Sequence, residues 1–222
     1  MSINVLYEDN HLLMVEKPVN VPVQADDSKD EDLLSMLKNY IKEKYNKPGN
    51  VYLGLVHRLD RPVGGAIVFA KTSKAASRLS NELRKQNFHR NYLAIVHGTP
   101  SKKQGQLKDY LWKDRKKNIV YAVDAKKKEA KQAILDYKVI HSAKSKSLVE
   151  VKLQTGRSHQ IRVQFANQNL PLYGDQKYGQ HINKPGQQIA LWASHLSVKH
   201  PTKDEMISVE TIPNDGIWTT YL

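Results

Sequence analysis

Residues 51–72 constrain the fold of this chain more than any other stretch, because they place a charged turn between two apolar runs. The runs are rich in β-branched and aliphatic residues, and a proline and two glycines punctuate the connection between them, a pattern typical of two buried strands joined by a turn. The turn, residues 57–62, reads His-Arg-Leu-Asp-Arg-Pro and places Asp60 at the expected end of a strand. Rigid neighbours there can hold a catalytic carboxylate in place. A solvated loop with surface ion pairs is the simpler interpretation of such charges.

Composition limits the kind of protein that can contain this turn. The 222 residues, 40% hydrophobic and 26% charged, suffice for a globular protein with a sizeable core, and no internal repeat or linker divides them. The absence of cysteine excludes disulfides, thiolate zinc sites and a thiol nucleophile. No apolar run approaches the roughly 20 residues that span a bilayer, and the N-terminus lacks the form of a signal peptide. We therefore expect one domain over residues 1–222 in a cytoplasmic protein.

The charge balance points to a polyanionic partner. Thirty-five Lys and Arg residues against 22 Asp and Glu residues give a formal net charge of +13. Phosphates bound to such a surface release counterions, and the field steers their approach, so a nucleic acid is a natural partner. A basic charge that only keeps the protein in solution is the open alternative.

Hydrophobic periodicity predicts several elements around the turn. We expect two short strands over residues 3–17 and a helix over residues 31–45, whose apolar residues recur at three- and four-residue steps. A second helix is expected over residues 73–87, with Ser73 as its N-cap, and a strand over residues 89–98.

A basic segment follows at residues 113–131. It holds eight Lys or Arg residues against three acidic ones, in two clusters separated by the apolar run 119–123. This predicts a hairpin-like element with basic ends. Contact with phosphates and simple solvation are equally good interpretations of those ends, so no residue of the segment is assigned a role.

A second polar motif follows residues 147–154, whose alternation predicts a strand. Residues 155–165 read Thr-Gly-Arg-Ser-His-Gln-Ile-Arg-Val-Gln-Phe. Thr155 is a suitable N-cap for a helix, and His159 and Arg162, three residues apart, would then share one face near its start. A lone His or Arg in such a place is more often a structural hydrogen-bonding residue.

These segments resemble, in the same order, those of the RluA-type pseudouridine synthases. Residues 57–60 match the His-Arg-Leu-Asp signature of that family, and residues 153–162 match its Leu-x-Thr-Gly-Arg-x-His-Gln-Ile-Arg motif almost residue for residue. Further matches are the Lys17-Pro18 pair, the strand around Tyr92, and the segments 174–179 and 191–201. The resemblance extends from about residue 3 to residue 212.

The resemblance implies an α+β fold, in which helices flank a mostly antiparallel mixed sheet with a central active-site cleft. It implies an enzyme that isomerises uridine to pseudouridine in structured RNA, either large-subunit ribosomal RNA or transfer RNA, without a cofactor or a metal. Many relatives carry a small S4-like RNA-binding domain ahead of this region. We expect this chain to lack it and to recognise RNA through its catalytic domain, as a monomer.

The same resemblance assigns roles to individual side chains. Asp60 would be the catalytic carboxylate, and Arg162 would pair with it and hold it ionised and oriented. Tyr92 would pack against the target base, and Arg58 would help to fill the space that the base leaves. The remaining motif residues are expected to contact the substrate: His57, Arg157, His159 and Gln160.

A carboxylate suits this reaction, because it can attack or stabilise C1′ of the ribose, as in retaining glycosidases, or act as a base on the sugar. Two alternatives stay open: a non-catalytic RNA-binding or chaperone protein on the same fold, and a metal-dependent nuclease. The nine His residues show no recognisable metal-ligand spacing for the nuclease. One departure concerns residues 63–65, which read Val-Gly-Gly where relatives often have Thr-Ser-Gly; without the two hydroxyl groups we expect a different local turn geometry and substrate preference, with the same catalytic carboxylate.

Overall fold

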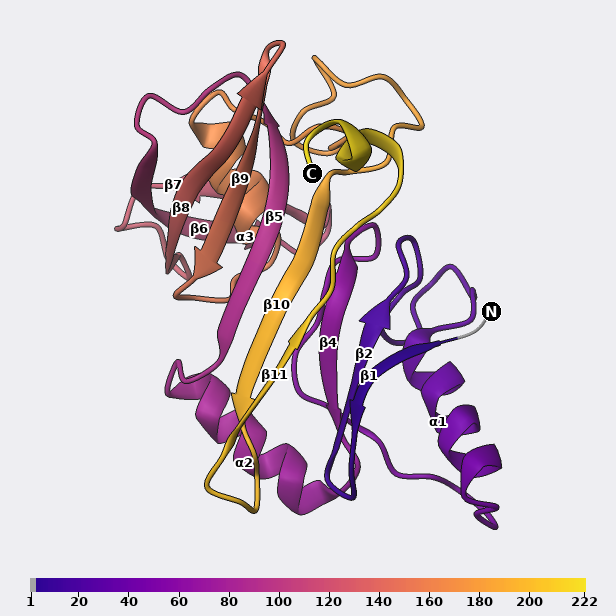
Figure 1. Ribbon diagram of the computed structural model, residues 1–222. Helices are drawn as coiled ribbons and strands as arrows, with labels where there is room; N and C mark the ends of the chain where they lie inside the picture. The colour runs from indigo at the N-terminus through magenta and orange to yellow at the C-terminus, as the bar shows by residue number, and fades with distance from the viewer. Residues whose placement is uncertain (1–2) are drawn as a thin grey trace. The chain divides into compact units, whose positions relative to one another are not determined.

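The computed structural model describes residues 3–222, and the chain divides into two compact units. Unit 1 comprises Met1–Arg90 and Ala193–Ile212, and unit 2 comprises Asn91–Trp192 and Pro213–Leu222. Each unit combines mostly antiparallel strands with helices (Figure 1), which confirms the predicted α+β class. The expectation of a single domain over the whole chain stays a prediction. No helix within residues 3–222 is long and apolar enough to cross a membrane.

Unit 1 contains strands in the order β1-β2-β4-β10, with β3 beside β4 and β11 beside β10. The pairs β1–β2, β2–β4, β3–β4 and β10–β11 are antiparallel. The predicted strand pair near the N-terminus and both predicted helices are confirmed. The elements are β1 (Asn4–Glu8), β2 (Leu12–Lys17), α1 (Leu33–Lys44), β3 (Gly54–Leu55), β4 (Gly64–Ala70), α2 (Ser73–Arg84), β10 (Leu191–Lys199) and β11 (Met206–Glu210).

Strands β2 and β4 form the centre of unit 1. Every residue of β4 is buried. Because side chains alternate between the two faces of a strand, Leu12 and Val68 pack on one face, where Leu79 of α2 joins them. Leu13 and Ile67 point to the opposite face and are also fully buried. The apolar run that follows the charged turn is therefore a strand buried on both faces, as its sequence predicted.

The packing of β4 requires the second glycine of the Val-Gly-Gly sequence, Gly65. Its φ is +112°, and a Cβ atom there would lie 2.6 Å from the backbone nitrogen of Ala193 in β10. No side chain fits at that distance, and L-residues rarely adopt that backbone conformation. Glycine is therefore required where β4 and β10 approach each other.

The two helices of unit 1 begin at side-chain caps. Oδ1 of Asp32 accepts a hydrogen bond from the Ser35 N–H at 3.1 Å and caps α1. Oγ1 of Thr72 accepts from the Ala75 N–H at 3.1 Å and caps α2. The predicted cap at Ser73 is therefore wrong by one residue, because Thr72 has the extended backbone that a cap requires, and Ser73 is already helical.

A cluster of polar side chains ties β1 to α1. Glu8 Oε2 accepts from Tyr40 Oη at 2.9 Å and from Lys44 Nζ at 2.8 Å, and Oε1 accepts from Tyr45 Oη at 2.8 Å and Lys71 Nζ at 2.7 Å. Burial opposes ionisation of this carboxyl group, but the four hydrogen bonds outweigh burial and lower the pKa of Glu8 to about 2.

We expect the Glu8 cluster to make stability depend on pH. Because the pKa of Glu8 is about 2 in the folded protein and near 4.5 normally, its contribution is complete above pH 4.5 and is lost as the pH falls towards 2. The measurement is the urea midpoint between pH 7 and pH 3, compared between wild type and Glu8→Gln. The two curves should converge as the pH falls. Glu43→Gln, on the exposed side of α1, should run parallel to wild type, and a constant gap for Glu8→Gln would contradict the prediction.

Unit 2 contains strands in the order β5-β9-β8-β6-β7, and each neighbouring pair is antiparallel. The predicted strands at residues 89–98, 119–123 and 147–154 are confirmed, and the basic segment forms the end of a hairpin. The elements are β5 (His89–His97), β6 (Gln104–Asp114), β7 (Ile119–Val123), β8 (Lys131–Ala143), β9 (Lys146–Leu153), α3 (Gln160–Asn167) and a 3-10 helix (Gly216–Thr220).

Helix α3 packs on one face of the unit 2 sheet, and it begins later than predicted. Val163 packs against Leu111 of β6 and Val120 of β7. We predicted a helix from Thr155, but α3 begins at Gln160, and its N-cap, His159, has a left-handed φ of 51°. Oγ1 of Thr155 accepts from the Ile134 N–H of β8 at 2.8 Å instead, so the first part of the motif is a turn bound to the sheet.

Candidate active site

The loop that carries Asp60 lies between β3 and β4 of unit 1. The Asp60 carbonyl accepts a hydrogen bond from the Val63 N–H at 2.9 Å, which closes a tight turn just before β4. Only Gly54 and Leu55 of the first apolar run form a strand, so the expected position of Asp60 at a strand end is wrong. Its side chain is half-buried.

The buried side chain of Lys17 anchors the backbone of this turn. It ends β2, is fully buried, and donates from Nζ to the carbonyls of Pro18 at 2.8 Å, Val21 at 2.7 Å and Arg61 at 2.9 Å. Arg61 is the residue after Asp60, so Lys17 connects the core strand to the backbone of the turn. A fully buried lysine is rare and requires such partners.

The charge state of Lys17 reflects two opposing effects. Burial lowers the pKa of Lys17 to about 7, while the negative charge of Asp60 acts to raise it. The three carbonyl acceptors match the three N–H donors of the protonated amine, whereas a neutral amine would have only two. The three hydrogen bonds therefore favour the protonated form of Lys17, an ammonium group near Asp60.

We expect Lys17→Met to disturb the Asp60 turn and any activity that depends on it. The substitution removes the donors of three carbonyls, and a buried acceptor left without a donor costs about 1–3 kcal/mol. The free energy of unfolding should fall, and any activity that depends on Asp60 should fall with it, since the turn loses its anchor. Steady-state kinetics and urea denaturation test this, with the exposed Lys74→Met on α2 as the control. An unchanged kcat in a folded Lys17→Met protein would overturn the positioning role.

His57 anchors the same loop on the core. It is buried, its Nε2 accepts from the Val68 N–H of β4 at 3.2 Å, and its ring meets Phe88 edge-on at 6.1 Å between centroids. Burial, assisted by the positive charge of Arg90, lowers the pKa of His57 to about 3. His57 is therefore a neutral core residue that positions the turn, and its predicted contact with substrate stays a prediction.

The two arginines of the first motif differ in their surroundings. Arg58 is exposed. Arg61 is also on the surface, but its Nε donates to the Asn20 carbonyl at 3.1 Å and its guanidinium pairs with Asp30. Arg61 therefore fastens the 18–30 segment to the turn, whereas the predicted contact of the exposed Arg58 with substrate stays a prediction.

The second motif in unit 2 is built around Gln160. This residue is buried, and its Oε1 accepts from Thr155 Oγ1 at 2.8 Å and from the Arg157 N–H at 2.9 Å. Its Nε2 donates to the Ile134 carbonyl of β8 at 3.1 Å and to Gln164 Oε1 at 3.0 Å. Gln160 therefore holds the motif turn in shape from within, and its predicted contact with substrate stays a prediction.

Arg162 forms a bidentate ion pair with Asp175. Its Nε and Nη2 donate to the two carboxylate oxygens at 2.8 Å each, and both residues are buried. Oδ1 of Asp175 also accepts from the N–H groups of Lys177 at 2.9 Å and Tyr178 at 3.1 Å. Burial opposes ionisation of Asp175, but Arg162 and these two N–H groups outweigh it and lower the pKa of Asp175. The pair fixes the plane of the Arg162 guanidinium.

Tyr178 joins His159 and Arg162, the two residues predicted to share a face. Its Oη lies 2.6 Å from His159 Nδ1 and accepts from the Val120 N–H of β7 at 2.9 Å. The Arg162 guanidinium lies over the Tyr178 ring, 5.2 Å from its centroid. Which of Nδ1 and Oη donates depends on the tautomer of the His159 imidazole.

The two other predicted site residues of unit 2 lie at different depths. Arg157 is exposed, and its Nε donates to the Gln132 carbonyl at 2.8 Å, which orients the guanidinium. Tyr92 is 7% exposed and lies on β5 opposite Val151 of β9. The predicted contact of Arg157 with substrate and the predicted packing of Tyr92 on the target base both stay predictions.

Sequence reasoning gave no role to three residues that organise these motifs. Lys17 contacts Arg61 across 44 positions of the chain, a pairing that no local pattern signals. Asp175 and Tyr178 belong to a matched segment. The Gly174-Asp175 pair is a turn signal that could have drawn attention to Asp175, whose carboxylate accepts from the N–H groups two and three residues later.

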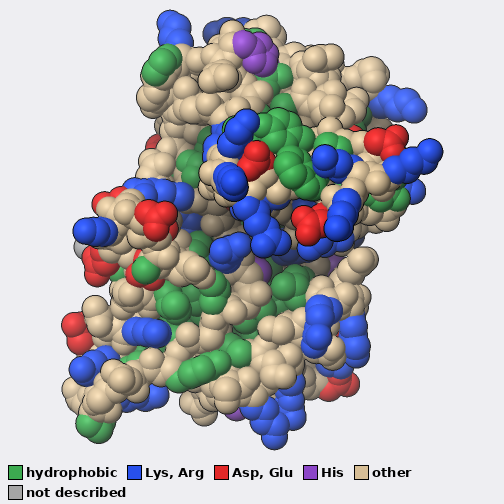
Figure 2. All heavy atoms as spheres, turned by 180° about the vertical axis from the view of Figure 1, so that it is seen from behind, with side chains coloured by type: hydrophobic (Ala, Val, Ile, Leu, Met, Phe, Trp, Pro, Cys, Tyr) green, Lys and Arg blue, Asp and Glu red, His purple; other side chains and the backbone are tan. Residues whose placement is uncertain are grey.

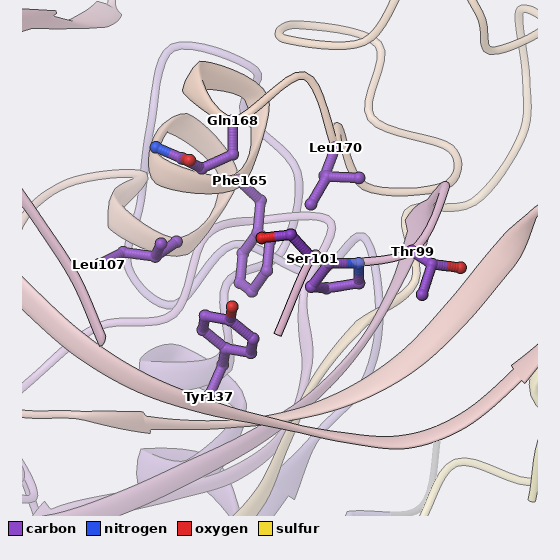
Figure 3. Close-up of a pocket in the computed structure, with 8 residues that line it drawn as sticks. Thr99, Ser101, Leu107, Tyr137, Phe165, Gln168 and Leu170 are labelled. Atoms are coloured by element: carbon purple, nitrogen blue, oxygen red, sulfur yellow. The ribbon is translucent and has the colours of Figure 1, made fainter. Parts of the chain in front are cut away.

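A small cavity in unit 2 lies apart from the predicted site residues. It measures about 210 Å³ and is lined by the β5–β6 loop, β8 and the C-terminal end of α3. Figure 3 shows Tyr137 and Phe165 at its centre, with Ser101 and Leu170 nearby. The residues that line it carry no charge. The rings of Tyr137 and Phe165 meet edge-on, with 5.8 Å between their centroids. We interpret it as a packing defect beside α3. Among residues 3–222, no group of three or more His, Asp or Glu residues could hold a metal ion.

The chain is similar to known proteins over almost its whole length. Residues 11–167 match the model of the RNA pseudouridylate synthase family. An uncharacterized RNA pseudouridine synthase of Bacillus subtilis is 36% identical over 212 residues, which cover 94% of this chain and 68% of that protein. A ribosomal large subunit pseudouridine synthase D of Zymomonas mobilis is 32% identical over 228 residues, covering 97% of this chain and 71% of that protein.

A solved structure supports the fold. Human RNA Pseudouridylate Synthase Domain Containing 4 matches with a TM-score of 0.78 and 22% identity, over 94% of this chain and 88% of that one. The two motifs at residues 57–60 and 153–162 thus occur in the fold that the resemblance implied, each braced by buried hydrogen bonds. The chain belongs to the RNA pseudouridylate synthase family and is an enzyme of that class.

Proposed function

We propose that this enzyme isomerises one or a few uridines in large-subunit ribosomal RNA, with Asp60 as its catalytic carboxylate. The observation that carries the assignment of Asp60 is the anchoring of its turn by the buried Lys17 ammonium, which holds the backbone next to Asp60 at 2.9 Å. Catalytic groups gain most from such rigid support. The choice of RNA follows relatives such as the Zymomonas protein, whose name specifies the ribosomal large subunit, and transfer RNA is the alternative.

The reaction breaks the N1–C1′ bond of uridine, turns the base, and forms a C5–C1′ bond, after which C5 loses its proton and N1 gains one. Asp60 either attacks C1′ or removes a proton from the sugar. In this proposal Tyr92 packs on the base, and Arg162, oriented by Asp175, keeps Asp60 ionised. Arg58, Arg157 and His159 contact the RNA from their exposed or half-exposed positions.

The uridine must leave its stack to reach these residues, which costs a few kcal/mol and favours loops over paired helices. We further propose that the enzyme works in the cytoplasm, as a monomer, and without a cofactor. A non-catalytic RNA-binding role on the same fold is the competing proposal, and it needs no intact Asp60.

Carbodiimide mapping of pseudouridines across all cellular RNA tests this function. A host that lacks the protein is compared with the same host carrying wild type or Asp60→Asn. One or a few sites in ribosomal RNA should disappear in the deletion strain and return with wild type alone. Sites in transfer RNA would move the substrate to the alternative class. Equal rescue by Asp60→Asn, or no change at any site, would favour the binding protein.

A further inference from the structure

The β6–β7 hairpin is the edge of the unit 2 sheet, and its two faces differ. Trp112 of β6 pairs with Tyr121 of β7 in the antiparallel register. Their neighbours Leu111 and Val120 pack with Val163 of α3 on the covered face. Because side chains alternate along a strand, Trp112 and Tyr121 point to the opposite face of the hairpin.

These two rings form an aromatic pair outside the core. Their centroids are 6.2 Å apart with an angle of 27° between the ring planes, and Tyr121 is 41% exposed. Trp112 is half-buried, whereas Trp192 and Trp218 are only 8% and 5% exposed. The two rings are stacked on the strand ribbon, and the exposed Tyr121 ring offers an aromatic surface to an incoming planar group.

Lysines and an arginine surround this aromatic pair. The turn after β6 and the turn after β7 both carry exposed basic residues, and the Nζ of Lys127 lies over the Trp112 ring at 4.9 Å from its centroid. Figure 2 shows Lys and Arg side chains gathered around exposed hydrophobic ones on the upper part of the face in view. The exposed basic residues of the two turns are Arg115, Lys116, Lys117, Lys126, Lys127 and Lys128.

The acidic residues of these turns shape the backbone. Oδ1 of Asp114 accepts from the N–H groups of Lys116 and Lys117, at 3.0 Å each. Oδ1 of Asp124 accepts from the Lys126 N–H at 2.8 Å. Each carboxylate therefore orders the turn on which the lysines stand, and the basic side chains extend from defined positions.

The hairpin also adjoins the second motif. Lys113 Nζ lies 3.4 Å from Ser158 Oγ within the motif turn, and Lys177 Nζ donates to the Asn118 carbonyl at 2.9 Å. Together with the bond from the Val120 N–H to Tyr178, these contacts place the hairpin end beside the turn that carries Arg157 and His159. These contacts lie on the covered face, and β7 is the edge strand, so an RNA bound at that turn would reach Trp112 and Tyr121 by passing around the edge of the hairpin.

We infer that Trp112 and Tyr121 form a stacking platform for an unpaired base of the RNA substrate, with the turn lysines binding the flanking phosphates. This inference rests on the proposed function only in taking RNA as the ligand. Flat aromatic rings bordered by cations are the chemistry that recognises single-stranded nucleic acid. Lys127 covers Trp112 in the free protein, but an exposed cation–π contact is weaker than a base stack, so Lys127 leaves the ring for a phosphate when RNA binds.

Fluorescence anisotropy with a uridine-rich single-stranded RNA, and with the same strand carrying abasic sites, tests the platform. The double variant Trp112→Ala/Tyr121→Ala should bind the intact strand roughly 10-fold more weakly than wild type, the range of one base stack. Wild type should bind the abasic strand more weakly than the intact strand by a similar factor, whereas the double variant should bind the two strands almost equally. The slope of affinity against salt should not change, because the platform carries no charge. Ile140→Ala, which removes another exposed apolar side chain from β8, is the control.

A second variant guards against a folding defect. Trp112→Phe keeps an aromatic ring, so it should bind the intact strand as wild type does. Wild-type tryptophan fluorescence should be quenched on RNA binding, and Trp112→Phe should lose this quenching, because the two remaining tryptophans are buried. Quenching that persists in Trp112→Phe, or an affinity that is equal for intact and abasic strands, would overturn the platform.

The two proposals fail in different ways. If the double variant binds RNA like wild type while wild type still forms pseudouridine, the platform is wrong and the proposed function stands. If the double variant binds more weakly on the intact strand only, but neither protein forms pseudouridine on any RNA, the platform stands for a binding protein.

Discussion

Replacing Asp60 by Asn should lower the rate of pseudouridine formation on the order of 10⁴-fold or more, while RNA binding stays within a factor of about two. The substitution keeps the size of the side chain and removes its charge, so it can neither attack C1′ nor accept a proton. A single-turnover reaction of the substrate RNA with excess enzyme, followed by carbodiimide detection of pseudouridine, measures the rate of the chemical step. Anisotropy on the same RNA measures binding.

Asp27→Asn supplies the matched control, since it makes the same change at an exposed position of unit 1. It should leave rate, binding and stability unchanged. If Asp60→Asn retained more than about a tenth of the wild-type rate with normal binding, the carboxylate would not take part in bond making or proton transfer, and another residue would have to carry the chemistry.

Asp175→Asn should reduce the free energy of unfolding by about 3–5 kcal/mol, because it removes the charged bidentate partner of the buried Arg162 guanidinium. Activity should fall as well, since the bidentate contact that orients Arg162 is lost. Urea denaturation monitored by circular dichroism measures the first effect. Asp204→Asn, which breaks the exposed pair with Lys199, should leave the urea midpoint unchanged.

A double variant separates structure from catalysis at this pair. Arg162→Met/Asp175→Leu replaces both charges by apolar groups of similar volume, a change that is often nearly neutral for stability. It should recover most of the stability lost in Asp175→Asn, and it should remain inactive if Arg162 is needed for the reaction. Full activity in a stable double variant would show that the pair serves only folding.

The sequence predicted best the elements whose formation depends on local pattern. The helices α1 and α2 and the strand β4 have strong periodicity or a continuous apolar run, and packing reinforced what the pattern favoured. The predicted start of α3 was wrong because the Thr155 hydroxyl accepts from the Ile134 N–H of β8 and does not cap a helix. Such a partner comes from strand pairing, which a local pattern does not contain.

The candidate site followed the same division. The motifs located His57, Asp60, Gln160 and Arg162, but burial and hydrogen bonds gave His57 and Gln160 a bracing position within the fold. The contacts that hold the motifs, Lys17 to Arg61 and Arg162 to Asp175, join residues 44 and 13 positions apart, beyond the reach of a local pattern.

The hydrogen bonds from Lys17 to three backbone carbonyls affect how easily the Asp60 turn unfolds locally. Loops that carry functional residues usually open more easily than the core, because few buried contacts hold them. The Asp60 turn can open only by breaking its bond to an ammonium group at the end of β2, a strand buried at the centre of unit 1. Opening would remove one of the three acceptors of that buried ammonium group and leave only the Pro18 and Val21 carbonyls, so the loop opens less readily than a loop without this anchor.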